Sequence, residues 1–197
     1  MSCSNRFSRC VGNRNYRPVF IIATEGSVTE PSYFEKFKRH EVVIDIVDSG
    51  QDSSPSGVLK SLKKHLKNRP LDKGEEAWIV IDRDIWPSEQ IEEVYKALSR
   101  MSPRGLYHLA LSNPKFEFWI LLHFEDGNGV STGTDCDQKL KKYLSGYKKD
   151  LSCWNPSLSD VRLAIERAKR MDKEECDWPK KRGTTVYRLV EMLIPND

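Results

Sequence analysis

The chain has 197 residues, a formal net charge of +3 and a mean hydropathy of −0.61. Its hydrophobic residues, 38% of the total, fall in periodic segments, so the chain can bury one sizeable core. No apolar run approaches the roughly 18 residues of a membrane helix, and no signal-peptide core precedes the first charged segment. Five cysteines are an odd number without a close pair. We therefore expect a cytoplasmic protein with reduced thiols and no membrane association.

The charges are unevenly distributed along the chain. Residues 1–17 contain four arginines and no acid, residues 18–127 carry a net charge of −4, and residues 128–197 carry +3. The composition of residues 1–17 predicts a basic disordered tail, which either contacts nucleic acid or has no binding role. Its lack of acidic residues is also typical of a transit peptide. Residues 18–127 are predicted to form a core, and residues 128–197 a helical extension packed on it. An acidic core with basic ends suits a metal site whose phosphate substrate is held from the periphery.

The predicted elements alternate between strands and helices. This order implies right-handed crossovers and an α/β fold with a mostly parallel four-stranded sheet. Helices are also expected over Leu158–Met171 and Thr184–Ile194 in the extension, and Ser56 is a candidate cap for the second helix. The core elements in chain order are a strand at Val19–Thr24, a helix from Thr29 to about Arg39, a strand at Val42–Val47, a helix with an apolar stripe from Val58 to Leu66, a strand at Ala77–Ile81, a helix opening at Pro87 and a strand at Tyr107–Leu111.

Acidic side chains follow two of these strands at the point where each ends. Asp82 and Asp84 come directly after the strand Ala77–Ile81, and strand alternation places them on one side with Arg83 on the other. Glu25 follows the first strand. Ligands of an open α/β sheet collect outside the carboxyl ends of its strands, so three carboxylates are expected to meet in one crevice. Their mutual repulsion would be relieved by a hard cation with oxygen ligands, Mg²⁺ or Mn²⁺.

A nearly all-apolar helix is predicted after the turn Ser112–Pro114. Its exception is Glu117, which either complements the helix dipole or points into the crevice as a further ligand or base. His123, near the helix end, is expected to pack or cap rather than to catalyse. A D-x-D pair at a strand end can also be purely structural, and a zinc site built from Cys136, Cys153 and Cys176 with a histidine is an alternative to the all-oxygen site.

These residues resemble a known family. Glu25-Gly26 after a strand, followed by helices and strands and then by Asp82-Arg83-Asp84, is similar to the Toprim catalytic core. More specifically, the chain resembles the RloB family over roughly residues 17 to 192. The blocks that carry this second resemblance are Glu25-Gly26, Thr29–Phe34, Asp82–Asp84, Ser112–Trp119, Leu122–Phe124 and Thr184–Glu191.

The resemblance implies a Toprim-like Rossmannoid core acting as a Mg²⁺-dependent nuclease effector in prokaryotic antiviral defence by abortive infection, with nucleic acid, including tRNA, as its substrate. It implies an AAA- or ABC-type ATPase as partner, and a chain of this size could form a homodimer. It assigns Glu25 as a general acid/base or metal ligand and Asp82 and Asp84 as metal ligands, with Glu117 as a further catalytic residue. Candidates for holding the substrate are Lys115, Arg104, Lys180, Lys181 and Arg182.

Two other functions remain open from the sequence. The acidic crevice could dock a non-catalytic subunit on the ATPase, or the basic segments could make the chain an RNA-binding module with an incidental metal site. The sequence contains neither a P-loop nor a nucleophile elbow, which argues against an ATPase or a serine hydrolase.

Overall fold

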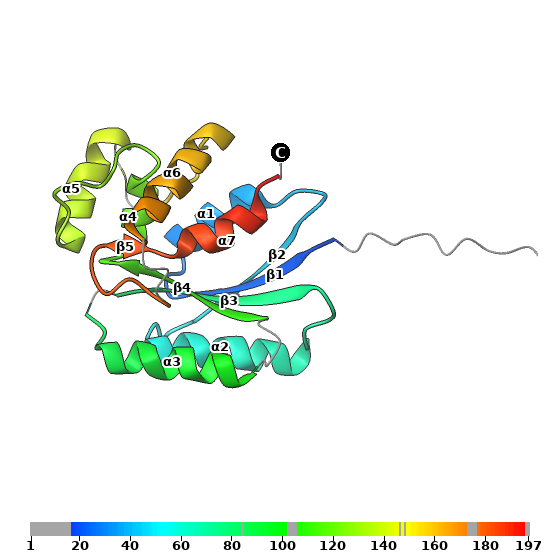
Figure 1. Cartoon of the computed structure of the whole chain (residues 1–197). Helices are drawn as coiled ribbons and strands as arrows, with labels where there is room; N and C mark the ends of the chain where they lie inside the picture. The colour runs from blue at the N-terminus through cyan, green and yellow to red at the C-terminus, as the bar shows by residue number, and fades with distance from the viewer. Residues whose placement is uncertain are drawn as a thin grey trace, which may run out of the picture.

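The computed structural model describes residues 17–83, 85–101, 106–145, 147, 149–172 and 177–195. In it a five-stranded sheet lies between two layers of helices (Figure 1). The elements in chain order are β1 (Val19–Thr24), α1 (Thr29–Phe34), the 3₁₀ turn η1 (Glu35–Phe37), β2 (Val43–Asp48), α2 (Pro55–Asn68), β3 (Glu75–Asp82), α3 (Ser88–Met101), β4 (Tyr107–Asn113), α4 (Phe116–Leu121), α5 (Gly133–Tyr143), α6 (Leu158–Met171), β5 (Gly183–Thr184) and α7 (Val186–Leu193).

The sheet has the strand order β2-β1-β3-β4-β5, in which the first four strands are parallel and β5 is antiparallel to β4. Both faces are covered, as expected for parallel strands whose crossover helices must pack back on the sheet. Because β1 lies between β2 and β3, the carboxyl ends of these strands share one edge. Thr24 pairs with Val80 across β1 and β3, so the chain leaves β1 immediately beside the end of β3.

The two faces of the sheet bury different sets of side chains. Alternate residues of β3 point to opposite sides, with Ala77, Ile79 and Ile81 facing α2 and α3. Trp78 and Val80 face the other layer, which is built from α1, α4, α5, α6 and α7. That second layer contains the large, fully buried aromatic side chains of the core. It also contains more helices than the layer of α2 and α3 (Figure 1).

The structure differs from the sequence-based expectation in three places. It has a fifth strand, β5, because the backbone of Gly183 and Thr184 pairs with the end of β4; two residues are too short to leave a periodic pattern. The first helix ends at Phe34 and continues only as a 3₁₀ turn to Phe37. The N-cap of α2 is Ser54, not Ser56, since its hydroxyl accepts a hydrogen bond from the Gly57 N–H.

The other predicted elements appear close to their expected bounds, and α6 matches them. None of the helices in the described part of the chain has both the length and the apolar character needed to cross a bilayer.

Candidate functional site

A polar cleft of about 470 Å³ opens at the carboxyl edge of the parallel strands. It lies where the loops after β1, β2, β3 and β4 come together, which is the usual ligand position in an open α/β sheet. Its wall carries four carboxylates and two lysines from separate parts of the chain. The lining residues are Glu25 to Glu30, Gly50, Gln51, Ser53, Asp82, Lys115, Glu117 and Lys149.

Glu25 is anchored at the end of β1 by bonds to the end of β3. Its backbone N–H donates to the Val80 carbonyl at 3.0 Å, which extends the β1–β3 pairing by one residue. Its carboxylate accepts the Asp82 backbone N–H at 2.9 Å and the Trp86 indole N–H at 3.0 Å. Two donors to two different oxygens fix the plane of the carboxylate. Trp86, which the sequence did not single out, is therefore a positioning residue for Glu25.

Asp82 is the carboxylate least compensated by its surroundings. One of its oxygens, Oδ1, is shielded from solvent and has no hydrogen-bond partner. Burial raises the pKa of Asp82 well above its usual value, and the nearby charges of Glu30, Glu25 and Glu117 raise it further; the Phe116 backbone N–H opposes them. A buried carboxylate surrounded by like charges is unstable in its ionised form unless a cation joins it.

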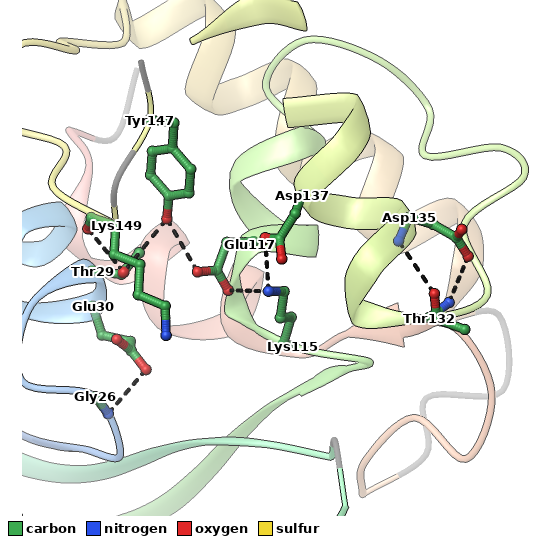
Figure 2. A network of polar contacts seen from close by, with 10 residues as sticks. All are labelled: Gly26, Thr29, Glu30, Lys115, Glu117, Thr132, Asp135, Asp137, Tyr147 and Lys149. Carbon is green, nitrogen blue, oxygen red and sulfur yellow. Dashed lines mark hydrogen bonds and ion pairs between the residues drawn. The ribbon is translucent and has the colours of Figure 1, made fainter. Parts of the chain in front are cut away.

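Glu30 joins this group from the first turn of α1. Only 5% of the residue is exposed, and its Oε1 accepts the Gly26 backbone N–H at 3.1 Å (Figure 2). Burial, with repulsion from Glu117 and Glu25, raises the pKa of Glu30 to about 7. A Cβ at position 26 would lie 2.3 Å from Glu30 Oε2, so this close approach requires glycine after Glu25. The sequence indicates only a helix that begins at Thr29, so Glu30 is absent from the predicted site.

Glu117 enters the cleft from α4 and belongs to a chain of polar contacts (Figure 2). Its Oε1 accepts the Tyr147 hydroxyl at 3.1 Å, and its Oε2 lies 3.8 Å from Lys115 Nζ. Lys115 also makes a closer ion pair, 2.8 Å, with Asp137 of α5. The positive charge of Lys115 is thus shared between two carboxylates, which leaves it less available to an incoming phosphate than the sequence suggested.

Lys149 is the second lysine of the cleft, and it comes from the loop after α5. Its backbone has φ of 69°, a left-handed conformation that costs a non-glycine residue roughly 1 kcal/mol. The Thr29 hydroxyl donates to its carbonyl at 2.9 Å and so holds this turn against α1. Figure 2 shows the side chain extending toward the Glu30 side of the cleft. No ion pair of Lys149 is found among the residues described, so this exposed ammonium faces the carboxylates as a candidate phosphate ligand.

The RloB-like protein family matches residues 20–193, which is most of the chain. The chain belongs to the RloB family. Neither a curated protein nor a solved structure matches it.

Not every residue predicted for the site of this RloB-family chain can be placed. Asp84 and Arg104 lie outside the described residues, as do Cys176 of the alternative zinc site and residues 1–16 of the predicted basic tail. Arg83 is placed: its guanidinium donates to the Ser88 hydroxyl at 3.1 Å, at the start of α3. It does not line the cleft, in keeping with the alternation of side chains along β3.

The predicted basic turn lies away from the carboxylates. Lys180, Lys181 and Arg182 are exposed in the segment before β5, and none of them lines the cleft. Lys180 lies instead near Glu92 of α3, whose pKa is lowered by a hydrogen bond and the charge from Lys96 and, after these, by the charge of Lys180. Of the predicted site residues, the structure thus brings together Glu25, Asp82, Glu117 and Lys115. It places the basic turn of Lys180, Lys181 and Arg182 elsewhere.

The donor chemistry of the cleft suits a hard cation. Glu25, Glu30, Asp82 and Glu117 supply only oxygen, and Asp82 Oδ1 is a buried acceptor without a donor. As the side chains stand, no three His, Cys, Asp or Glu side chains within the described ranges are close enough together to share one metal ion. Cys136 is buried and Cys153 is exposed, and both are free thiols. Burial raises the pKa of the Cys136 thiol to about 12, which opposes the thiolate form that zinc requires.

His123 lies in an aromatic cluster on the same side of the sheet. Its Nε2 is 3.1 Å from the Tyr33 hydroxyl, and its Nδ1 is 3.1 Å from the Trp119 carbonyl. With Nδ1–H donating to that carbonyl, Nε2 accepts a hydrogen bond from the Tyr33 hydroxyl. Burial lowers the pKa of His123 to about 4, so the ring is neutral near pH 7. The side chain holds α4 against α1 and does not line the cleft.

Proposed function

We propose that this chain is a Toprim-type, Mg²⁺- or Mn²⁺-dependent nuclease of prokaryotic antiviral defence, acting on a phosphodiester of RNA or DNA and working with an AAA- or ABC-type ATPase. RloB membership and the resemblance of the Glu25 and Asp82 segments to a Toprim core support the reaction class. The observation that carries the proposal is Asp82, whose buried, unpartnered Oδ1 lies among three further carboxylates at the carboxyl edge of a parallel sheet.

Glu25, Asp82 and Asp84 would hold the divalent ion, with Glu30 and Glu117 beside them. A bound Mg²⁺ supplies Lewis acidity toward a phosphate and makes a neighbouring water more acidic. The residues of the chain supply orientation and proton transfer. Glu25, held by Trp86, presents a fixed carboxylate, and Glu30, with a pKa of about 7, can carry a proton near neutral pH. Lys149 would bind the substrate phosphate on the open side of the cleft.

Cleavage assays on the purified protein test the proposal. Wild type, Asp82→Asn and Glu92→Gln would be incubated with tRNA, single-stranded RNA and duplex DNA in Mg²⁺, Mn²⁺ or EDTA, with and without an AAA- or ABC-type ATPase. We expect wild type to cleave one of these substrates only when metal is present, and Asp82→Asn to lose at least about 100-fold of the rate.

Glu92→Gln is the matched control, because it also neutralises one carboxylate but only removes a surface ion pair with Lys96 on α3. It should cleave like wild type. Cleavage that is unaffected by Asp82→Asn, or that persists in EDTA, would falsify the proposal. Activation of the ATPase by Asp82→Asn without any cleavage would favour a docking subunit, and salt-sensitive RNA binding without cleavage would favour a binding module.

A further inference from the structure

The helix α2 has an unusual distribution of charge. It contains Lys60, Lys63, Lys64 and Lys67 and no acidic residue in its fourteen positions. All four lysines are exposed, whereas the apolar residues of the helix are buried against the sheet. At 100° per residue the lysines fall within an arc of about 100° on the solvent side. We call these four residues the α2 lysine stripe.

The stripe is unfavourable for the helix itself. Lys60 is three and four positions from Lys63 and Lys64, and both of these are again three or four positions from Lys67. Like charges at these spacings destabilise a helix by about 0.2–0.5 kcal/mol per pair. No ion pair of these lysines is found in the part of the chain that the structure describes. The pKa of Asp52 is lowered by hydrogen bonds from Ser54 and, after these, by the charge of Lys60.

The neighbouring helix shows that this layer does not require such a surface. α3 packs on the same face of the sheet, has a similar length and carries both signs of charge. Its Lys96 pairs with Glu92 at 2.7 Å, four residues earlier. A helix with mixed charges is already well solvated, so solubility does not explain why α2 has four lysines and no acid. An anionic partner would explain this pattern.

The stripe begins a short way along the chain from the carboxylate cleft. Gly50, Gln51 and Ser53 line the cleft, and the same loop continues into Ser54, the N-cap of α2. Lys60 follows less than two turns later, and the stripe then extends about 10 Å along the helix, away from the cleft. A polymer with one of its phosphates in the cleft is therefore long enough to reach the lysines.

We propose that the α2 lysine stripe binds the backbone phosphates of a nucleic acid that extends from the carboxylate cleft. The inference rests on the proposed function for the class of substrate, and it adds where the substrate lies. Lysines that contact phosphates release counterions, so each contact contributes about 0.7–0.9 to the slope of log K against log salt. Contacts of this kind fix the path of the strand and do not read its sequence.

Fluorescence anisotropy in EDTA, where a metal-dependent nuclease does not cleave, tests the inference. The probes are a labelled single-stranded RNA of about 20 nucleotides and a DNA duplex of similar length. Lys63→Gln/Lys67→Gln should lower the salt slope by about 1.4 for the RNA or about 1.8 for the duplex, and weaken binding at 0.1 M salt about 25-fold or about 60-fold respectively. Glutamine keeps the helix propensity of lysine, and thermal unfolding checks the fold.

The matched control is Lys141→Gln/Lys142→Gln, which removes two exposed lysines from α5 on the other face of the sheet. It should keep the wild-type slope. Equal loss in both double variants would mean diffuse binding by net charge and would overturn the inference, as would an unchanged Lys63/Lys67 variant. Lysine-dependent binding to vesicles containing phosphatidylserine, without binding to either probe, would also overturn it. If lysine-dependent binding is found but wild type never cleaves, the proposed function fails while the stripe stands.

Discussion

The carboxylate cleft and the aromatic cluster around His123 are built by the same two helices. α1 supplies Glu30 to the cleft and Tyr33 to the cluster, and α4 supplies Glu117 to the cleft as it leads to His123. In the cluster, both ring nitrogens of the buried histidine have partners and the ring is neutral. In the cleft, buried carboxylates are close to one another, and one oxygen of Asp82 has no partner.

The buried histidine stabilises the fold, whereas the buried carboxylates destabilise it until a ligand binds. A neutral group with satisfied hydrogen bonds adds to stability, whereas several acids in one cleft reduce it unless a cation binds. The same layer of the molecule thus contains the tightly packed aromatic cluster and, one helical turn away, the carboxylate cleft, in which the acids repel one another. The predictions that follow test this contrast.

The largest effect is expected from removing His123. His123→Ala deletes a fully packed ring and leaves the Tyr33 hydroxyl without its partner, which should lower the free energy of unfolding by about 3–4 kcal/mol. Asp82→Asn, by contrast, removes a repelled charge and should leave stability unchanged or raise it. Urea unfolding at pH 7 measures both, with His40→Ala as a surface control. A more severe loss for Asp82→Asn than for His123→Ala would reverse the contrast.

Opposite dependences on pH form the second prediction. The folded-state pKa of Glu30, about 7, lies above its unfolded value near 4.5, so its contribution to stability is lost as pH rises from about 4.5 to 7. The pKa of His123, about 4, lies below its unfolded value near 6.5, so its contribution is lost as pH falls from about 6.5 to 4. Each change amounts to roughly 3 kcal/mol.

Comparison with neutral variants separates the two groups. As pH rises from about 4.5 to 7, the free energy of unfolding of wild type should fall relative to that of Glu30→Gln. Over the same range it should increase relative to that of His123→Gln. Asp82, whose pKa is also raised, acts in the same direction as Glu30. Urea titrations at pH values from about 4.5 to 7.5 give both differences. If both stability differences changed with pH in the same direction, the predicted contrast between the cleft and the cluster would be wrong.

The contrast also explains what could be predicted from the sequence. The apolar runs that precede Glu25 and Asp82 mark the ends of two strands, so the sequence predicts that these residues lie close together. The pairing of β1 with β3 brings them into contact. Trp86 carries no such mark, because its bond to Glu25 depends on how the loop after β3 folds back.

Residues fixed by distant contacts escaped prediction for the same reason. Lys149 meets Thr29 across 120 positions of sequence, and Tyr147 meets Glu117 across 30. Neither spacing has a local periodicity, so the sequence gives only a lysine-rich stretch there. β5 was missed because a two-residue strand exists only through its partner, β4.

Divalent metal provides the third prediction. If Mg²⁺ binds among the cleft carboxylates, it should stabilise the folded state by about 2.7 kcal/mol when its concentration is 100 times the dissociation constant. The stabilisation should be strongest above pH 7, where Glu30 is ionised, and absent in Asp82→Asn. His123→Gln should retain it, because that residue lies outside the cleft. Differential scanning fluorimetry with Mg²⁺, Mn²⁺ and EDTA measures the shift, and a shift of equal size in Asp82→Asn would place the metal elsewhere.

The smallest effect is expected at the link between the loop after α5 and the cleft. Tyr147→Phe removes only the hydroxyl that donates to Glu117, and it should cost about 1 kcal/mol of stability. Tyr143→Phe is its matched control, since that hydroxyl also donates to a glutamate, Glu125, at 2.9 Å but on an exposed surface. We expect the rate of cleavage to fall about tenfold for Tyr147→Phe alone, because Glu117 and the Lys149 loop lose a shared anchor. If the two variants cleave equally well, Tyr147 serves only the packing of that loop, and the orientation of Glu117 must come from Lys115.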